Sequence, residues 1–151
     1  MEMTTAWYRS NGKTRERILD NPDNKLRIMV VDDEVHILNV ISLKLRNAGF
    51  EVLTAQDGRE ALELAQVESP DLIITDLQMP FLSGLELCTR LKQIPATQKI
   101  PAILLTARGF SIDQTQMSAA GIKTCVNKPF GPRDLLAIVE NILRPSEKTK
   151  R

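Results

Sequence analysis

The sequence lacks the features that mark membrane proteins and nucleic-acid-binding proteins. None of its apolar runs approaches the roughly 18 residues that a membrane-spanning helix needs, and the N-terminal segment is too polar for a secretory signal peptide. The 20 Lys and Arg residues face 19 Asp and Glu residues, so the net charge of +1 favours neither nucleic acid nor an anionic membrane. We therefore expect no membrane and no direct nucleic acid among the partners.

Cysteine and histidine are also scarce. The two cysteines, Cys88 and Cys125, form no Cys-x-x-Cys pair, and there is no cluster of His and Cys residues. These spacings argue against a disulfide framework and against a zinc site. The expected location is the reducing cytoplasm.

The sequence does have the composition of an ordinary globular protein. Its 151 residues are 42% hydrophobic and 26% charged, which suits one domain with a packed core. Residues 1–25 are polar and end in a run of turn formers, so they are expected to be a flexible extension, although Trp7 and Tyr8 leave open a docking segment. The domain is expected over 26–144, followed by a basic tail at 145–151.

From Leu26 onward, short apolar runs alternate with stretches whose apolar residues recur at helical spacing. Each such pair predicts a strand followed by a helix. The five pairs are 26–31 with 35–45, 52–54 with 59–67, 72–75 with 84–91, 100–106 with 111–120, and 123–126 with 133–143. Because crossovers between parallel strands are right-handed, five successive pairs predict an α/β fold with a parallel sheet covered by helices on both faces.

Polar and charged residues follow four of these predicted strands directly. They are Asp32 and Asp33 after the first strand, Asp76 after the third, Thr106 with Ala107 after the fourth, and Lys128 with Pro129 after the fifth. In open parallel sheets, ligands bind outside the carboxyl ends of the strands, where the winding order reverses. If the third strand lies beside the first, the three carboxylates converge and raise one another's pKa unless a cation neutralises them.

A hard divalent cation fits this group of acids. Oxygen ligands with few protein carboxylates and room for water suit Mg²⁺ or Mn²⁺, and the lack of a His/Cys cluster disfavours zinc. A carboxylate beside such an ion could be a ligand alone or a nucleophile. The Thr106 hydroxyl and the Lys128 ammonium favour a nucleophile, because together with the metal they supply a partner for each oxygen of a transferring phosphoryl group. We therefore hypothesise an aspartyl phosphate.

These motifs resemble the receiver domain of two-component response regulators, of the kind found in chemotaxis regulators. The resemblance extends from about Leu26 to Leu143 and rests on four motifs in order. The motifs are Asp32-Asp33, Asp76 within Asp-Leu-Gln-Met-Pro, Leu105-Thr106-Ala107 and Lys128-Pro129-Phe130. The resemblance implies a flavodoxin-like three-layer sandwich with five helices and a five-stranded parallel sheet in the order 2-1-3-4-5.

The resemblance also implies a role for each acid. Asp76 would accept a phosphoryl group from a histidine kinase, a histidine phosphotransfer protein or a small donor such as acetyl phosphate. Asp33, Asp76 and the backbone carbonyl of Gln78 would bind Mg²⁺ directly, and Asp32 would hold the metal through water.

The remaining motif residues would contact the phosphoryl group. By the same resemblance, Thr106 and the Ala107 amide would donate to phosphoryl oxygens, Lys128 would be the counter-cation, and the Lys128–Pro129 bond would be cis. Arg108 is hypothesised to pair with the phosphoryl oxygens and prolong the signal. The chain departs from the family at Cys125, three residues before Lys128, where the family has the Tyr or Phe of its switch.

The resemblance implies a signalling role rather than an enzymatic one. No output domain follows residue 143 in this sequence, so the signal is expected to pass to an unknown downstream protein, from a monomer or a phosphorylation-dependent homodimer. Two alternatives stay open: a binding module of the same fold that works without phosphorylation, and a receiver fragment of a larger regulator. A hydrolase that forms an aspartyl phosphate would need a second Asp where Gln78 stands. A flavin carrier would need a phosphate-binding loop instead of Asp32-Asp33-Glu34.

Overall fold

The computed structural model describes residues 25–107 and 112–144. In this part of the chain, five parallel strands form one sheet: β1 (Arg27–Val31), β2 (Glu51–Ala55), β3 (Leu72–Asp76), β4 (Ala102–Thr106) and β5 (Ile122–Asn127). Their order is β2-β1-β3-β4-β5, so the winding direction reverses between β1 and β3. The predicted strand order is confirmed.

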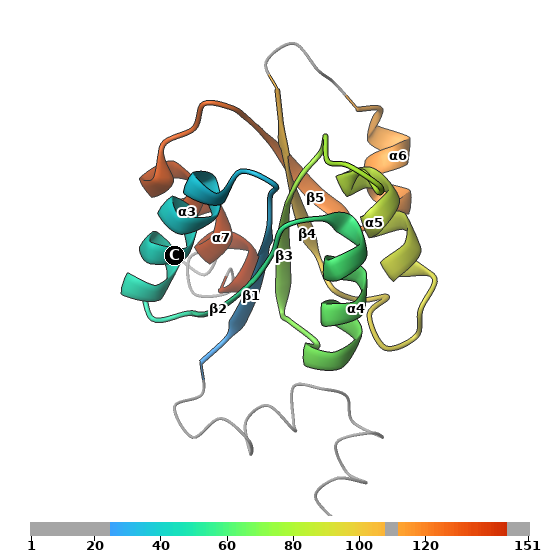
Figure 1. Cartoon of the computed structure of the whole chain (residues 1–151), viewed down its shortest axis with the longest axis horizontal. Coiled ribbons are helices and arrows are strands. Elements are labelled where there is room, and N and C mark those ends of the chain that lie inside the picture. The colour runs from blue at the N-terminus through green and yellow to red at the C-terminus, as the bar shows by residue number, and fades with distance from the viewer. Residues whose placement is uncertain (1–24, 108–111, 145–151) are drawn as a thin grey trace, which may run out of the picture.

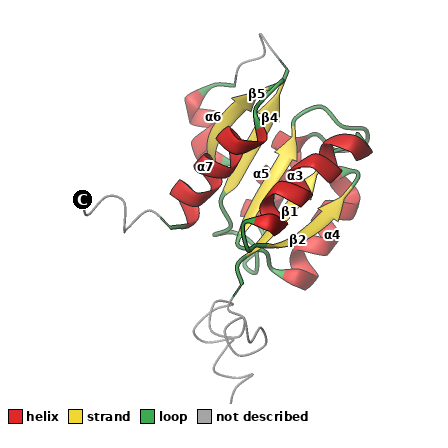
Figure 2. Cartoon of the chain, turned by 90° about the vertical axis from the view of Figure 1, so that its left-hand side faces the viewer, coloured by secondary structure: helices red, strands yellow, loops and turns green. Residues whose placement is uncertain are grey.

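Five helices of the described residues alternate with the strands. They are α3 (Val35–Asn47), α4 (Gly58–Glu68), α5 (Gly84–Lys92), α6 (Gln114–Ala119) and α7 (Pro132–Leu143). Helices α3 and α7 cover one face of the sheet, and α4, α5 and α6 cover the other (Figures 1 and 2). The fold is therefore the predicted flavodoxin-like three-layer sandwich.

Two apolar cores hold the helices on the sheet. Successive side chains of a strand point to opposite faces, so Ile28 and Val30 of β1 pack with α3 and α7, whereas Met29 and Val31 pack with α4 and α5. Every residue of the central strands β3 and β4 is buried, as expected for strands covered on both faces. The polar residues that follow these strands are thus presented on a rigid support.

Side-chain caps fix where several helices begin. The Asp57 carboxylate accepts the Glu60 N–H at 2.8 Å at the start of α4, and Ser83 and Glu86 form a reciprocal capping box at the start of α5. The Asp113 carboxylate accepts the Thr115 N–H at the start of α6. Within the described residues, the helix predicted from residue 111 therefore begins at Gln114.

The fourth strand begins two residues later than predicted. Pro101 has no N–H to donate to a neighbouring strand, and the Ile100 N–H donates to the Thr97 carbonyl at 3.1 Å in a turn. The regular ladder therefore begins at Ala102.

Some predictions fall outside the described residues. They concern the extension up to Asn24, including Trp7 and Tyr8, as well as Arg108 and the tail 145–151. Of the helices that are described, none combines the length and the apolar character needed to cross a membrane.

Candidate functional site

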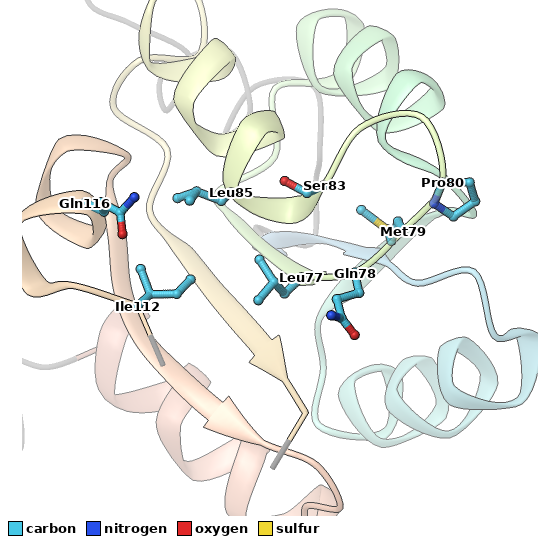
Figure 3. A pocket seen from close by; sticks show the side chains of 8 residues that line it. All are labelled: Leu77, Gln78, Met79, Pro80, Ser83, Leu85, Ile112 and Gln116. Atoms are coloured by element: carbon cyan, nitrogen blue, oxygen red, sulfur yellow. The ribbon is translucent and has the colours of Figure 1, made fainter. Parts of the chain in front are cut away.

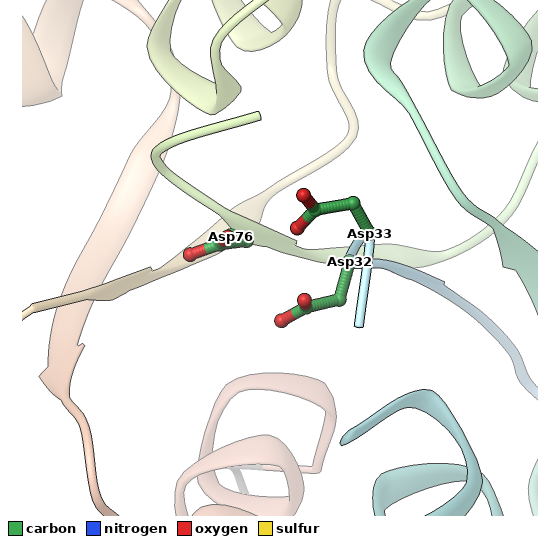
Figure 4. A group of neighbouring side chains, drawn as sticks. All are labelled: Asp32, Asp33 and Asp76. Atoms are coloured by element: carbon green, nitrogen blue, oxygen red, sulfur yellow. The ribbon is translucent and has the colours of Figure 1, made fainter. Parts of the chain in front are cut away.

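Three carboxylates meet where β1 and β3 end. Because Val31 of β1 pairs with Thr75 of β3, the next residues, Asp32 and Asp76, lie side by side. One carboxylate oxygen from each of Asp32, Asp33 and Asp76 lies within 4.8 Å of the others (Figure 4). Asp32 is fully buried and Asp76 is 8% exposed, whereas Asp33 is exposed. The convergence expected from the strand ends is present.

This arrangement fits a divalent cation bound by oxygen. Buried carboxylates side by side repel one another, and a small hard cation held by one or two carboxylates and several waters relieves that repulsion. The exposed Asp33 leaves one side of the group open to solvent. Gln78 lies on the loop between β3 and α5, two residues after Asp76, and its backbone carbonyl stays a predicted ligand.

Lys128 brings a cation of the chain itself into the same group. Its Nζ lies 3.1 Å from Asp32 Oδ2, 3.2 Å from Asp76 Oδ1 and 4.0 Å from Glu34 Oε1. Lys128 directly follows β5, so the sheet holds its backbone at the same edge as the acids. Its ammonium group therefore bridges the two buried carboxylates.

The electrostatics of the site reflect this bridge. Burial raises the pKa of Asp76 above its ordinary value, the charges of Asp32 and Asp33 raise it further, and Lys128 acts in the opposite direction. Burial would lower the pKa of Lys128, but the hydrogen bonds and charges of Asp32 and Asp76 outweigh it and raise that pKa. Lys128 is therefore a fixed positive charge at neutral pH.

The two acids after β1 do not merely cap the next helix. Glu34 occupies the N-cap position of α3 and makes no side-chain capping bond. Asp32 uses one oxygen locally, accepting the Glu34 N–H at 2.9 Å, and the other to bind Lys128, which lies 96 positions away in the sequence. Local capping thus accounts for only half of what Asp32 does.

Thr106 ends β4 at the same edge of the sheet. Its hydroxyl donates to Asn127 Oδ1 at 2.9 Å, and its carbonyl accepts the Lys128 N–H at 2.7 Å. Ala107 follows and is exposed, and the Lys128–Pro129 bond is cis, as expected. The sequence reasoning missed Asn127, which pairs with Thr106 in the β4–β5 register.

A separate cavity of about 630 Å³ lies beside this edge, between the β3–α5 loop and the start of α6 (Figure 3). Eight residues line it: Leu77, Gln78, Met79, Pro80, Ser83, Leu85, Ile112 and Gln116. None of their side chains is an acid or a base, so this cavity adds no titratable group to the three carboxylates and Lys128.

The sequence model of the response regulator receiver domain matches residues 28–140 of this chain. The chain belongs to the response regulator receiver domain family. It is 42% identical over 123 residues to the alkaline phosphatase synthesis transcriptional regulatory protein PhoP of Bacillus subtilis, a match that covers 80% of this chain and 50% of PhoP. The chain spans about half the length of the curated relatives it matches.

Solved receiver domains have the same fold. The chemotaxis response regulator CheY4 of Vibrio cholerae superposes with a TM-score of 0.72 at 33% identity, covering 78% of this chain and 98% of CheY4. The receiver domain of a sensor histidine kinase from Pseudomonas aeruginosa PAO1 superposes with a TM-score of 0.69 at 27% identity, covering 78% of this chain and 96% of that domain. The latter structure holds a magnesium ion in its active-site cleft.

This receiver domain has a thiol where the family resemblance leads one to expect an aromatic ring. Cys125 lies in β5, with its Sγ 3.8 Å from Met117 Sδ of α6, and partial burial raises the pKa of its thiol. A small side chain packed against α6 cannot provide the rotating ring of the family's switch.

Proposed function

We propose that this receiver domain accepts a phosphoryl group on Asp76 from a histidine kinase or a histidine phosphotransfer protein, in a Mg²⁺-dependent reaction. The signal then passes on through contacts with protein. The observation that carries this proposal is the meeting of three carboxylates and one ammonium group at a single sheet edge, with Lys128 Nζ 3.2 Å from Asp76 Oδ1.

The transfer would proceed by attack of an Asp76 carboxylate oxygen on phosphorus. The new P–O bond forms as the bond from phosphorus to the donor imidazole nitrogen breaks, and the imidazole leaves with that electron pair. Protonated Lys128 would pair with one phosphoryl oxygen, and the Thr106 hydroxyl and the Ala107 amide would donate to others. Catalysis is then mainly positioning and charge neutralisation.

The acids would also hold the metal. Asp33, Asp76 and the Gln78 backbone carbonyl would bind Mg²⁺, with Mn²⁺ as a substitute, and Asp32 would act through water. When bound, the ion supplies positive charge that neutralises the acids and the phosphoryl oxygens. The magnesium-bearing receiver domain from P. aeruginosa supports this assignment.

The biological role is signalling rather than turnover. We place the domain in the cytoplasm, as a monomer or a phosphorylation-dependent homodimer without direct nucleic-acid contact of its own. The phosphorylated state would be read by an attached output region or by a separate protein.

Intact mass spectrometry tests the proposal. Wild type is incubated with acetyl phosphate in Mg²⁺ or in EDTA, beside Asp76→Asn and a control, Asp134→Asn, which alters an exposed acid on α7. Wild type and the control should gain one phosphate only in Mg²⁺, and Asp76→Asn should gain none. A gain in Asp76→Asn would remove Asp76 from its role, and no gain in wild type would favour a binding module that works without phosphorylation.

A further inference from the structure

The Thr106 hydroxyl is already engaged before any phosphoryl group arrives. It donates to Asn127 Oδ1 at 2.9 Å across the β4–β5 pair, where Thr106 and Asn127 are register partners. Thr106 is 1% exposed, and Asn127 is exposed. The hydrogen bond therefore joins a buried hydroxyl to a side chain at the protein surface.

A threonine hydroxyl has only one proton to donate. Leu105 pairs with Asp76 in the β3–β4 register, so Thr106 lies one residue further along at the same edge. A phosphoryl group on Asp76 would place strong acceptor oxygens there, in competition with Asn127 for that proton. The hydroxyl can satisfy one of these acceptors at a time.

The backbone of Thr106 is fixed, so only a rotation of its side chain can move the hydroxyl from Asn127 to a phosphoryl oxygen. The Thr106 carbonyl accepts the Lys128 N–H at 2.7 Å, and the β4–β5 ladder holds the residue on the same side. A β-branched side chain occupies discrete staggered χ1 rotamers. Changing partner therefore means a jump between rotamers rather than a gradual shift.

We infer that Asn127 is a positioning residue that holds the Thr106 hydroxyl in the resting state, and that phosphorylation of Asp76 breaks this hydrogen bond. The inference rests on the proposed function and extends it. After release, the exposed Asn127 amide is solvated by water, whereas the buried Thr106 hydroxyl gains a phosphoryl oxygen. Asn127 thus sets how readily the domain leaves its resting state, by contacts that do not involve an aromatic ring.

Removing the Asn127 acceptor should favour the phosphorylated state. One net hydrogen bond of about 1 kcal/mol corresponds to about a fivefold change in an equilibrium constant. Asn127→Leu, which keeps the approximate size of the side chain, and Asn127→Ala should therefore bind the phosphoryl mimic beryllofluoride about fivefold more tightly than wild type. Because the side chain is exposed, neither change should unfold the protein.

The experiment is a titration with beryllofluoride at saturating Mg²⁺, followed by ¹⁹F NMR, on wild type, both Asn127 variants and Asn141→Leu. Asn141 is exposed on α7 and serves as the matched control. The Asn127 substitutions are repeated in a Thr106→Val background. Residue 106 then has no hydroxyl for Asn127 to hold, so changing Asn127 should leave the affinity for beryllofluoride unchanged. In wild type, the Asn127 side-chain amide resonance should also shift on binding, and in Thr106→Val it should not.

Tighter binding that depends on the Thr106 hydroxyl supports the inference. Unchanged or weaker binding by the Asn127 variants, or a gain that persists in Thr106→Val, overturns it while leaving the phosphoacceptor role of Asp76 standing. Failure of wild type to bind beryllofluoride at all overturns the proposed function and this inference together.

Discussion

Replacing Lys128 with methionine tests the electrostatic arrangement of the site. Lys128 Nζ lies 3.1 Å from Asp32 and 3.2 Å from Asp76, and Asp32 is fully buried. At such distances an ion pair is worth about 5 kcal/mol at an effective dielectric constant of about 20, and about 1 kcal/mol in water. The substitution removes both pairs and leaves the two carboxylates facing each other.

The net loss is smaller than the sum of the two attractions. Lys128 itself is partly desolvated in the folded state, and its side chain remains 23% exposed, so solvent screens part of the interaction. Removing one partner of a buried ion pair typically costs about 3–5 kcal/mol. For this partly exposed lysine, we expect the free energy of unfolding at pH 7 without metal to fall by about 3 kcal/mol.

The loss should depend on pH and on Mg²⁺. Lys128 lowers the pKa of Asp76, so its removal moves that pKa further above the ordinary value of 3.8. Asp76 of the folded variant then binds a proton more tightly than Asp76 of the unfolded chain. The loss in free energy of unfolding relative to wild type is therefore small at low pH and grows as the pH rises through the folded-state pKa. Mg²⁺ neutralises the same acids, so it should reduce the difference in free energy of unfolding between Lys128→Met and wild type at pH 7.

Urea unfolding of wild type, Lys128→Met and Lys123→Met provides the measurement, in EDTA and in Mg²⁺, from pH 4 to pH 8. Lys123 is exposed on the same strand and serves as the control. The reasoning fails if Lys128→Met in EDTA is no less stable than Lys123→Met, or if Mg²⁺ does not reduce the difference between them.

Three further substitutions test the packing of the folded domain. The Ser42 hydroxyl is buried in α3 without a hydrogen-bond partner among the described residues, so Ser42→Ala should raise the free energy of unfolding by about 1 kcal/mol in urea, and a loss would show an unseen partner. A Cβ on Gly84 would overlap the Asp76 carbonyl oxygen, so Gly84→Ala should cost about 3 kcal/mol and weaken Mg²⁺ binding, and a stability equal to wild type would contradict this packing. Burial raises the pKa of the Cys88 thiol from 9.0 to about 12, so above pH 9 the unfolded chain loses the thiol proton before the folded protein does. The free energy of unfolding of wild type should therefore fall, relative to that of Cys88→Ala, by up to about 1.4 kcal/mol per pH unit. If the free energy of unfolding of wild type and of Cys88→Ala changed with pH in parallel, the Cys88 thiol would not be buried as described.

The strand ends were the most predictable part of this molecule. In a parallel sheet, residues that follow different strands collect at one edge whatever the side chains are, so the apolar pattern alone predicted a common edge for Asp32, Asp76, Thr106 and Lys128. Their closeness depended also on the strand order, which came from the resemblance to receiver domains. The periodicity of apolar residues likewise placed all five strands and helices, because burial on one or two faces governs that pattern.

Contacts between particular side chains were not predictable in this way. The bond from Thr106 to Asn127 depends on the register of two strands and on side-chain rotamers, and composition carries neither. Val35 follows the helical apolar period and is the first residue of α3, but it is 51% exposed. Periodicity predicts which face a residue occupies, but not how far the neighbouring layer extends.

The most direct test of the central claim is to locate the phosphoryl group chemically. Borohydride reduction converts an aspartyl phosphate to homoserine, and peptide mass spectrometry after treatment with acetyl phosphate and Mg²⁺ reads the position. We predict homoserine at position 76 alone, and none when EDTA replaces Mg²⁺. Homoserine at position 32 or 33, or at position 76 in the presence of EDTA, would contradict the account.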